Sequence, residues 1–187
     1  QLPRNDCAVV ALDFQGNHGI ATSLGHAPAA ALADAAKGSV LAITEALTNI
    51  VFAAIDGGIH SVSLSANWMW PCKNEGEDAR LYRAVEAASD YAQALGINIP
   101  TGKDSLSMTQ KYRDGELVYA PGTVIITAAA EVSDIRKSIS PALKHTKSQL
   151  VYVDMSRSAF NLGGSSFAQT LGFVGSNVPT VESADYF

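Results

Sequence analysis

Glu45 and Asn49 are the two side chains whose types and spacing most clearly suggest chemistry. They stand four residues apart in an otherwise apolar stretch, residues 41–52. In a helix, residues at i and i+4 share one face, with Cβ atoms about 5–6 Å apart. A carboxylate beside an amide oxygen suits Mg²⁺, which completes its coordination with water and phosphate oxygens. A solvated polar face or a simple hydrogen-bonded pair would show the same spacing, so both alternatives stay open.

Asp6 is a candidate for a third oxygen ligand. It immediately precedes residues 7–14 (CAVVALDF), an apolar and β-branched run that predicts a strand. A carboxylate at the end of a strand, beside a loop, can face a bound cation. From the sequence alone, however, an ordinary turn residue is the simpler explanation.

Two glycine-containing segments could face a ligand. Residues 101–105 (TGKDS) combine a cation, a carboxylate and a hydroxyl in what we predict to be a short turn. Lysine can neutralise phosphate as a point charge, but the sequence contains no GxxxxGK[ST] pattern of a P-loop. Residues 163–166 (GGSS) precede a predicted short helix, and a tight turn with a serine cap explains them more simply than an anion site.

The predicted elements that position these residues favour an α+β fold. Asp34 is a suitable N-cap and Gly96 a suitable C-cap for two amphipathic helices. A polar connector near residues 134–148 separates a first domain, residues 1–134, from a shorter second one, residues 135–187. The helices are predicted at 34–55, 77–95 and 166–171, the strands at 7–14, 60–68, 97–100, 123–132 and 149–154, a hairpin at 107–119 and a long loop at 15–28.

Composition excludes several classes of function. The 187 residues carry 13 Lys+Arg against 18 Asp+Glu, a net charge of -5, so the basic footprint of a general nucleic-acid binder is missing. The uncharged run at residues 117–130 is broken by Pro121 and Gly122 and is too short to span a bilayer. Cys7 and Cys72 form no CxxC pair, which argues against a disulfide scaffold or zinc site and favours a cytoplasmic location. The sequence begins at Gln1, and we expect it to be a piece of a longer protein.

Four segments together resemble one enzyme family: residues 44–50 (TEALTNI), 64–69 (LSANWM), 76–82 (GEDARLY) and 101–108 (TGKDSLSM). The family is large, single-chain phosphoribosylformylglycinamidine synthase, a purine-biosynthetic ligase also called FGAR amidotransferase. The resemblance covers essentially the whole chain and implies an AIR-synthetase (PurM)-like fold, with a mixed sheet and helices on one face. It places residues 1–134 in the N-terminal subdomain of the second synthetase half and residues 135–187 at the start of the C-terminal subdomain.

The resemblance also implies a reaction and a nucleotide site. The family uses ATP, glutamine and water to convert formylglycinamide ribonucleotide into formylglycinamidine ribonucleotide. Its second half holds an auxiliary site for Mg²⁺ and ADP or ATP. The metal ligands map onto Asp6, Glu45 and Asn49, and a further Asp ligand and a Ser lie beyond residue 187. Asn5 maps onto a nucleotide contact, although that position is commonly small and apolar in the family.

By the same resemblance, Lys103, Asp104 and Ser105 belong to a loop on the substrate side. The implied partners are the first synthetase half, a PurS-like domain and a glutaminase domain of the same chain. The family's catalytic histidine, glutaminase triad and glycine-rich ATP segment match nothing in this sequence. We therefore expect this piece to be inactive alone. The resemblance also implies that first subdomains pair into a shared β-barrel, so without its partner half the isolated piece is expected to self-associate through its exposed sheet.

Two alternatives to this function stay open. One is a piece of another ATP-dependent enzyme of the AIR-synthetase superfamily. The other is a structural or oligomerisation module that binds no ligand.

Overall fold

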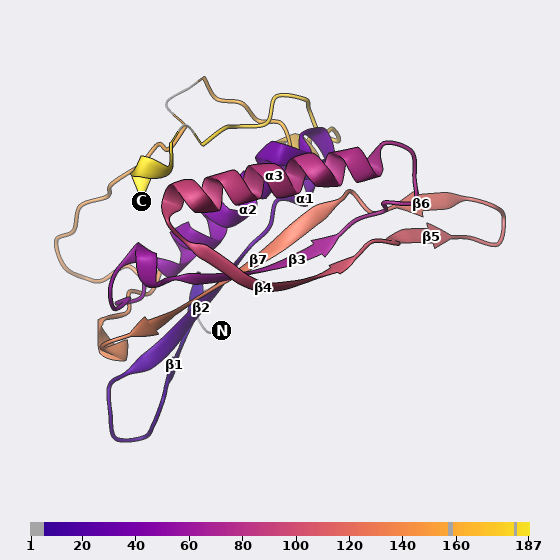
Figure 1. Cartoon of the computed structure of the whole chain (residues 1–187). Helices are drawn as coiled ribbons and strands as arrows, with labels where there is room; N and C mark the ends of the chain where they lie inside the picture. The colour runs from indigo at the N-terminus through magenta and orange to yellow at the C-terminus, as the bar shows by residue number, and fades with distance from the viewer. Residues whose placement is uncertain (1–5, 157–158, 182) are drawn as a thin grey trace.

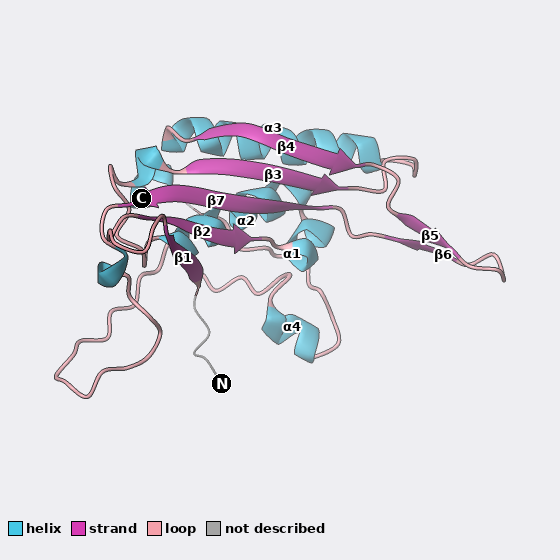
Figure 2. Ribbon diagram, turned by 90° about the horizontal axis from the view of Figure 1, so that it is seen from below, coloured by secondary structure: helices cyan, strands magenta, loops and turns pink. Residues whose placement is uncertain are grey.

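A five-stranded mixed sheet carries two long helices on one face (Figures 1 and 2). The structure is a computed structural model, and it describes residues 6–156, 159–181 and 183–187. The strand order is β1-β2-β7-β3-β4, in which β3 and β4 run parallel and the other neighbours antiparallel. This arrangement confirms the predicted α+β class and the predicted placement of helices on one face.

Figure 1 labels the elements, and it shows the β5–β6 hairpin projecting from the end of the sheet. The strands of the sheet are β1 (Cys7–Ala11), β2 (Gly19–Gly25), β3 (Ser63–Met69), β4 (Asn98–Ser105) and β7 (Thr123–Val132). The hairpin pairs β5 (Thr109–Lys111) with β6 (Leu117–Tyr119). The helices are α1 (Pro28–Ala33), α2 (Ala35–Ile50), α3 (Glu77–Leu95) and α4 (Ser166–Thr170), with 3-10 turns η1 (Ile59–Ser61), η2 (Ile135–Lys137) and η3 (Ala184–Tyr186).

The core lies between the helix layer and the sheet. Ile43 and Leu47 of α2 are fully buried there against Leu64 and Ile126 of the sheet. The opposite face of the sheet carries no helix, as Figure 2 shows, and side chains such as Ile20 on that face are exposed. We call this second face the open face.

The predicted helix caps are confirmed, but α2 is shorter than predicted. The Asp34 carboxylate accepts a hydrogen bond from the Lys37 backbone N–H at 3.1 Å, and Gly96 ends α3 with a φ of 66°. Helix α2 ends at Ile50 rather than at residue 55. The backbone after α2 instead runs to the end of β7, where Ile55 forms an isolated β-bridge with Val132.

The prediction of a continuous loop over residues 15–28 was wrong, because β2 lies within it. The side of β2 that faces α2 consists of Gly19, Ala21, Ser23 and Gly25, all of them buried. These small residues give no apolar signal, which is why the alternation of buried and exposed positions was missed. Helix α1, which follows directly, was missed as well.

Two further strand predictions need correction, one in its end point and one in its existence. The short strand at 97–100 continues as β4 through Ser105, so residues 101–105 are not a turn. Pro100 is tolerated because β4 is an edge strand. The predicted strand at 149–154 is absent among the described residues 138–156, and Leu150 is 92% exposed. A strand needs a neighbour for its backbone groups, and no described strand pairs with this segment.

Within the described part of the chain, no helix combines the length and the apolar character needed to cross a membrane.

Candidate functional site

Glu45 and Asn49 both reach the carboxyl end of β2. The Glu45 carboxylate oxygen Oε2 accepts a hydrogen bond from the His26 backbone N–H at 2.6 Å. The Asn49 side-chain nitrogen Nδ2 donates to the Leu24 carbonyl at 2.9 Å. One helix therefore presents a carboxylate and an amide to the same strand end.

Asp6 lies at the same edge of the sheet. It precedes β1, whose first residue, Cys7, pairs with Ser23 of β2. Burial, and after it the charge of Asp6, raises the pKa of the Cys7 thiol. The structure thus brings Glu45 and Asn49 to one end of β2, and Asp6 immediately precedes β1, the strand that pairs with β2.

These residues do not form a preassembled cluster of titratable ligands. Among the described residues, no three His, Cys, Asp or Glu side chains are grouped closely enough to hold a metal ion. The candidate set contains two carboxylates, Asp6 and Glu45, with the amide of Asn49 as the third group. Asn5, the predicted nucleotide contact, lies outside the described residues.

The close approach of β2 to α2 determines where Glu45 lies. A Cβ atom at Gly25 would overlap the Ala42 carbonyl oxygen and the Ala46 nitrogen. The Ser23 hydroxyl donates to the Ala46 carbonyl at 2.6 Å. Only small side chains allow this contact, and it places Glu45 beside the residue that follows β2, His26.

Glu45 lines a cavity of about 570 Å³. One wall is formed by α2 and residues 26–30, and the other by Gly163–Ser166 from the far end of the chain. Gly164, with a φ of 73°, packs against Ala30 so tightly that a Cβ atom would overlap the helix backbone. No local pattern in the sequence indicates that this second segment lies across the cavity from Glu45.

Residues 163–166 form the capped turn that the sequence predicted as the simpler alternative. The Ser165 hydroxyl accepts a hydrogen bond from the Ala168 backbone N–H at 3.0 Å. The backbone N–H groups of Gly163 and Gly164 donate to carbonyls of Asn177 and Val174. Because these two N–H groups already donate to backbone carbonyls, they are not available to bind an anion.

Strand alternation separates the three residues that were predicted as one substrate-side loop. The Lys103 ammonium donates to the Ser105 hydroxyl at 2.8 Å, so these two side chains lie together on the open face. Asp104 pairs in register with Trp68, whose side chain packs on the helix side of the sheet. Burial, and then nearby carboxylates that include Asp104, raises the pKa of the Cys72 thiol. Asp104 therefore faces away from Lys103.

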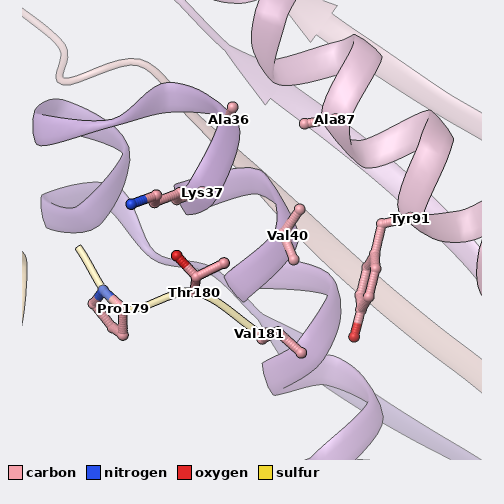
Figure 3. A pocket seen from close by; sticks show the side chains of 8 residues that line it. All are labelled: Ala36, Lys37, Val40, Ala87, Tyr91, Pro179, Thr180 and Val181. Atoms are coloured by element: carbon pink, nitrogen blue, oxygen red, sulfur yellow. The ribbon is translucent and has the colours of Figure 1, made fainter. Parts of the chain in front are cut away.

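A second cavity, of about 190 Å³, lies between α2, α3 and residues 179–181 (Figure 3). Its described walls are mainly apolar, with Val40, Tyr91 and Val181 among them. The Lys37 ammonium donates to the Val178 carbonyl at 3.3 Å. This contact holds the C-terminal segment on the helices, and the apolar walls suit packing better than the binding of a charged nucleotide.

The fold is similar to solved structures of PurL from Thermotoga maritima. The complex of that PurL with FGAR matches with a TM-score of 0.59 and 15% identity over 73% of this chain and 20% of that one. The Thermotoga maritima PurLQS structure matches with a TM-score of 0.59 and 17% identity over 73% of this chain and 21% of that one. The PurL complex with ADP matches with a TM-score of 0.56 and 18% identity over 73% and 21%. The chain spans about a fifth of the length of these structures, and identities this low establish the fold alone.

A protein-family model also matches the sequence. The match covers residues 1–131, well over half of the chain, and the family is described as the FGAR-AT PurM_N-like domain. The matched range includes the whole five-stranded sheet except the last residue of β7, together with α1, α2 and α3. The chain therefore belongs to the FGAR-AT PurM_N-like domain family.

Proposed function

We propose that the chain contributes an auxiliary Mg²⁺–nucleotide site and part of the substrate cleft to a phosphoribosylformylglycinamidine synthase. Family membership supports this proposal, and the PurL structures of similar fold include complexes with FGAR, ADP and ATP. The whole enzyme would turn formylglycinamide ribonucleotide, ATP, glutamine and water into formylglycinamidine ribonucleotide, ADP, phosphate and glutamate. In this proposal the piece is inactive alone, because it spans about a fifth of the matched structures.

The other parts of the enzyme would come from the same longer chain. We propose a first synthetase half, a PurS-like domain and a glutaminase domain as partners, and residues 135–187 as the start of a second subdomain. The exposed apolar segment around Leu150 supports the last point, since such a segment calls for a neighbouring strand. The free thiols of Cys7 and Cys72 support a cytoplasmic location.

One observation carries the proposed metal site: Glu45 and Asn49 converge on the end of β2, beside a cavity. Because Asn49 uses its nitrogen on the Leu24 carbonyl, its oxygen Oδ1 is the atom left for a cation. Glu45 is fixed through Oε2, which leaves Oε1 for the same purpose. With the carboxylate of Asp6, this is the all-oxygen donor set that Mg²⁺ prefers.

Each residue has a defined part in the proposed site. Asp6, Glu45 and Asn49 would hold Mg²⁺, and the metal would neutralise phosphate charge of ADP or ATP. Asn5 would contact the nucleotide. The His26 backbone N–H keeps the Glu45 carboxylate at the cavity wall. The cavity, at about 570 Å³, is within the size range of small-molecule sites.

Lys103 and Ser105 support the substrate-side part of the proposal. Their side chains lie together on the open face, where the cation can attract a phosphate and the hydroxyl can hydrogen-bond to it. Asp104 was included in the predicted loop, but its side chain belongs to the opposite face of the strand. We therefore keep only Lys103 and Ser105 in the substrate cleft.

Isothermal titration of ADP in the presence of Mg²⁺ tests the metal site. Glu45→Gln keeps an acceptor for the His26 N–H but removes the charge that the cation needs. Its dissociation constant should rise at least about tenfold, the effect of losing one charge-assisted contact. Glu86→Gln, the same change at an exposed position of α3, should bind like wild type. If Glu45→Gln binds as tightly as wild type, the proposed metal site is wrong.

An interaction module that binds no ligand is the second candidate function. The open face, which bears exposed apolar side chains, favours it. Such a module would show no Mg²⁺-dependent binding of ADP, so the same titration separates the two functions.

A further inference from the structure

Arg80 of α3 joins three parts of the chain that are far apart in sequence. Its nitrogen Nη1 donates to both carboxylate oxygens of Glu77, at 2.7 and 2.8 Å. Its other terminal nitrogen, Nη2, donates to the Ala31 carbonyl at 2.7 Å. The carbonyls of Leu32 and Pro121 lie at 3.4 and 3.5 Å from the same atom. One guanidinium thus connects α3 to the end of α1 and to the turn before β7.

The aromatic ring of Trp70 fixes the position of this guanidinium. The Arg80 carbon Cζ lies 5.6 Å from the ring centroid, in the range of a cation–π contact. Trp70 is fully buried, and Gly122, with a φ of 73°, packs so closely that a Cβ atom would lie 2.6 Å from the ring. The ring cannot move aside, so Arg80 is held between Trp70 and Glu77.

Helix α1 needs such a support. It has only six residues and no side-chain cap at its N-terminus, and a helix of this length is not stable by itself. The Arg80 guanidinium donates a hydrogen bond to a carbonyl at the C-terminal end of α1, where the helix dipole favours a positive charge. The other end of the same segment, residues 26–30, is the wall of the cavity beside Glu45.

We infer that Arg80 is a positioning residue, which holds the C-terminal carbonyls of α1 and thereby fixes the cavity wall that faces Glu45. The inference deepens the proposed function and rests on it for the ligand. The chain of contacts is continuous: Arg80 binds Ala31, α1 leads back to His26, and the His26 N–H binds Glu45.

Hydrogen exchange combined with ADP titration tests this role. Arg80→Lys keeps the charge but loses the planar fork that reaches Glu77 and Ala31 together. Amide exchange across residues 26–33 should become about tenfold faster, and the dissociation constant of ADP with Mg²⁺ should rise by a similar factor, as one charge-assisted hydrogen bond is lost. Exchange in β7 should stay unchanged. Arg83→Lys, one turn away on the exposed face of α3, should change neither quantity.

Two results would overturn the inference. If exchange accelerates equally in β7, Arg80 only stabilises the whole fold. If ADP binding weakens while exchange over residues 26–33 is unchanged, Arg80 acts on the ligand directly. Should Arg80→Lys not fold, Glu77→Gln removes the anchoring carboxylate instead and should loosen the same segment to a smaller degree.

A failure of the proposed function gives a different pattern. Wild type would then show no Mg²⁺-dependent binding of ADP, whereas Arg80→Lys would still loosen residues 26–33 selectively. That combination supports the positioning role of Arg80 and removes only the assigned ligand.

Discussion

Hydrogen bonds to the backbone set the orientation of the candidate ligands at the scale of single residues. An asparagine side chain can present either its oxygen or its nitrogen to a ligand. In this chain the Leu24 carbonyl accepts a hydrogen bond from the Asn49 nitrogen, and the His26 N–H donates one to an oxygen of Glu45. Both interactions leave oxygen atoms for a third partner, which favours a cation over an anion at this site.

Tyr91 gives a prediction about pH at the same scale. Its side chain is buried against α2, with its hydroxyl 3.3 Å from the Thr44 hydroxyl. Burial raises the pKa of Tyr91 above its usual value of 10.0, and the contact with Thr44 offsets part of this rise. Because the folded pKa is the higher one, the stabilisation is complete below the unfolded pKa and is lost as the pH rises through the folded value.

The free energy of unfolding should therefore fall more steeply above about pH 10 in wild type than in Tyr91→Phe, which has no group to ionise there. Urea unfolding on both sides of this pH measures the difference. Tyr152→Phe, a change at an exposed tyrosine, should follow wild type. Identical alkaline behaviour of wild type and Tyr91→Phe would contradict the prediction.

The sequence could predict only part of the candidate site. The placement of Glu45 and Asn49 on one helix face followed from their spacing, and the strand after Asp6 from its β-branched run. Their backbone partners depend on how α2 packs on β2, and no local pattern encodes that. The grouping of Lys103 with Asp104 failed because a strand was taken for a turn, and alternation sends neighbours to opposite faces.

At the scale of elements, the contact between β2 and α2 positions the site. Gly25→Ala would place a methyl group against the backbone of Ala42 and Ala46, which cannot yield as a flexible side chain can. We expect a loss of about 1–3 kcal/mol or more in the free energy of unfolding, typical of overpacking. Urea unfolding measures it.

Thr22→Ala provides the control, because Thr22 lies on the exposed side of the same strand. It should cost less than about 1 kcal/mol, the span of strand propensities. A Gly25→Ala protein as stable as the Thr22→Ala protein would show that β2 does not pack on α2 as described.

Elements with a strong apolar period were predicted well, and the others were not. Helix α3 and strand β7 have the predicted bounds because their patterns are long and regular. Strand β2 was not predicted because its buried positions are glycine, alanine and serine, which give no apolar alternation. The segment at 149–154 has the composition of a strand, but pairing is a property of two segments, and the described chain offers no neighbour.

At the scale of the whole molecule, the open face of the sheet has no covering layer in the described structure (Figure 2). Val10 and Ile20 pair across β1 and β2 and are both exposed on this face. Apolar side chains on an uncovered sheet favour association. We expect the isolated chain to self-associate through it.

Sedimentation equilibrium tests this expectation with two matched variants. Ile20 is 41% exposed on the open face, and Val85 is 42% exposed on the outer face of α3. Ile20→Lys should shift the chain toward monomer, because the charge would have to be desolvated in the contact. Val85→Lys should associate like wild type. Equal effects of the two substitutions would rule out the open face as the contact.

Thermal unfolding of the wild-type chain with ADP tests the proposed Mg²⁺-dependent nucleotide site built on Asp6, Glu45 and Asn49. The melting temperature is followed over increasing ADP, once with Mg²⁺ and once with a chelator. We expect a saturable stabilisation seen only with the metal, reaching about 2.7 kcal/mol when free ADP is about 100 times the dissociation constant. An unchanged melting temperature with Mg²⁺ and ADP together, or an equal rise without the metal, would contradict it.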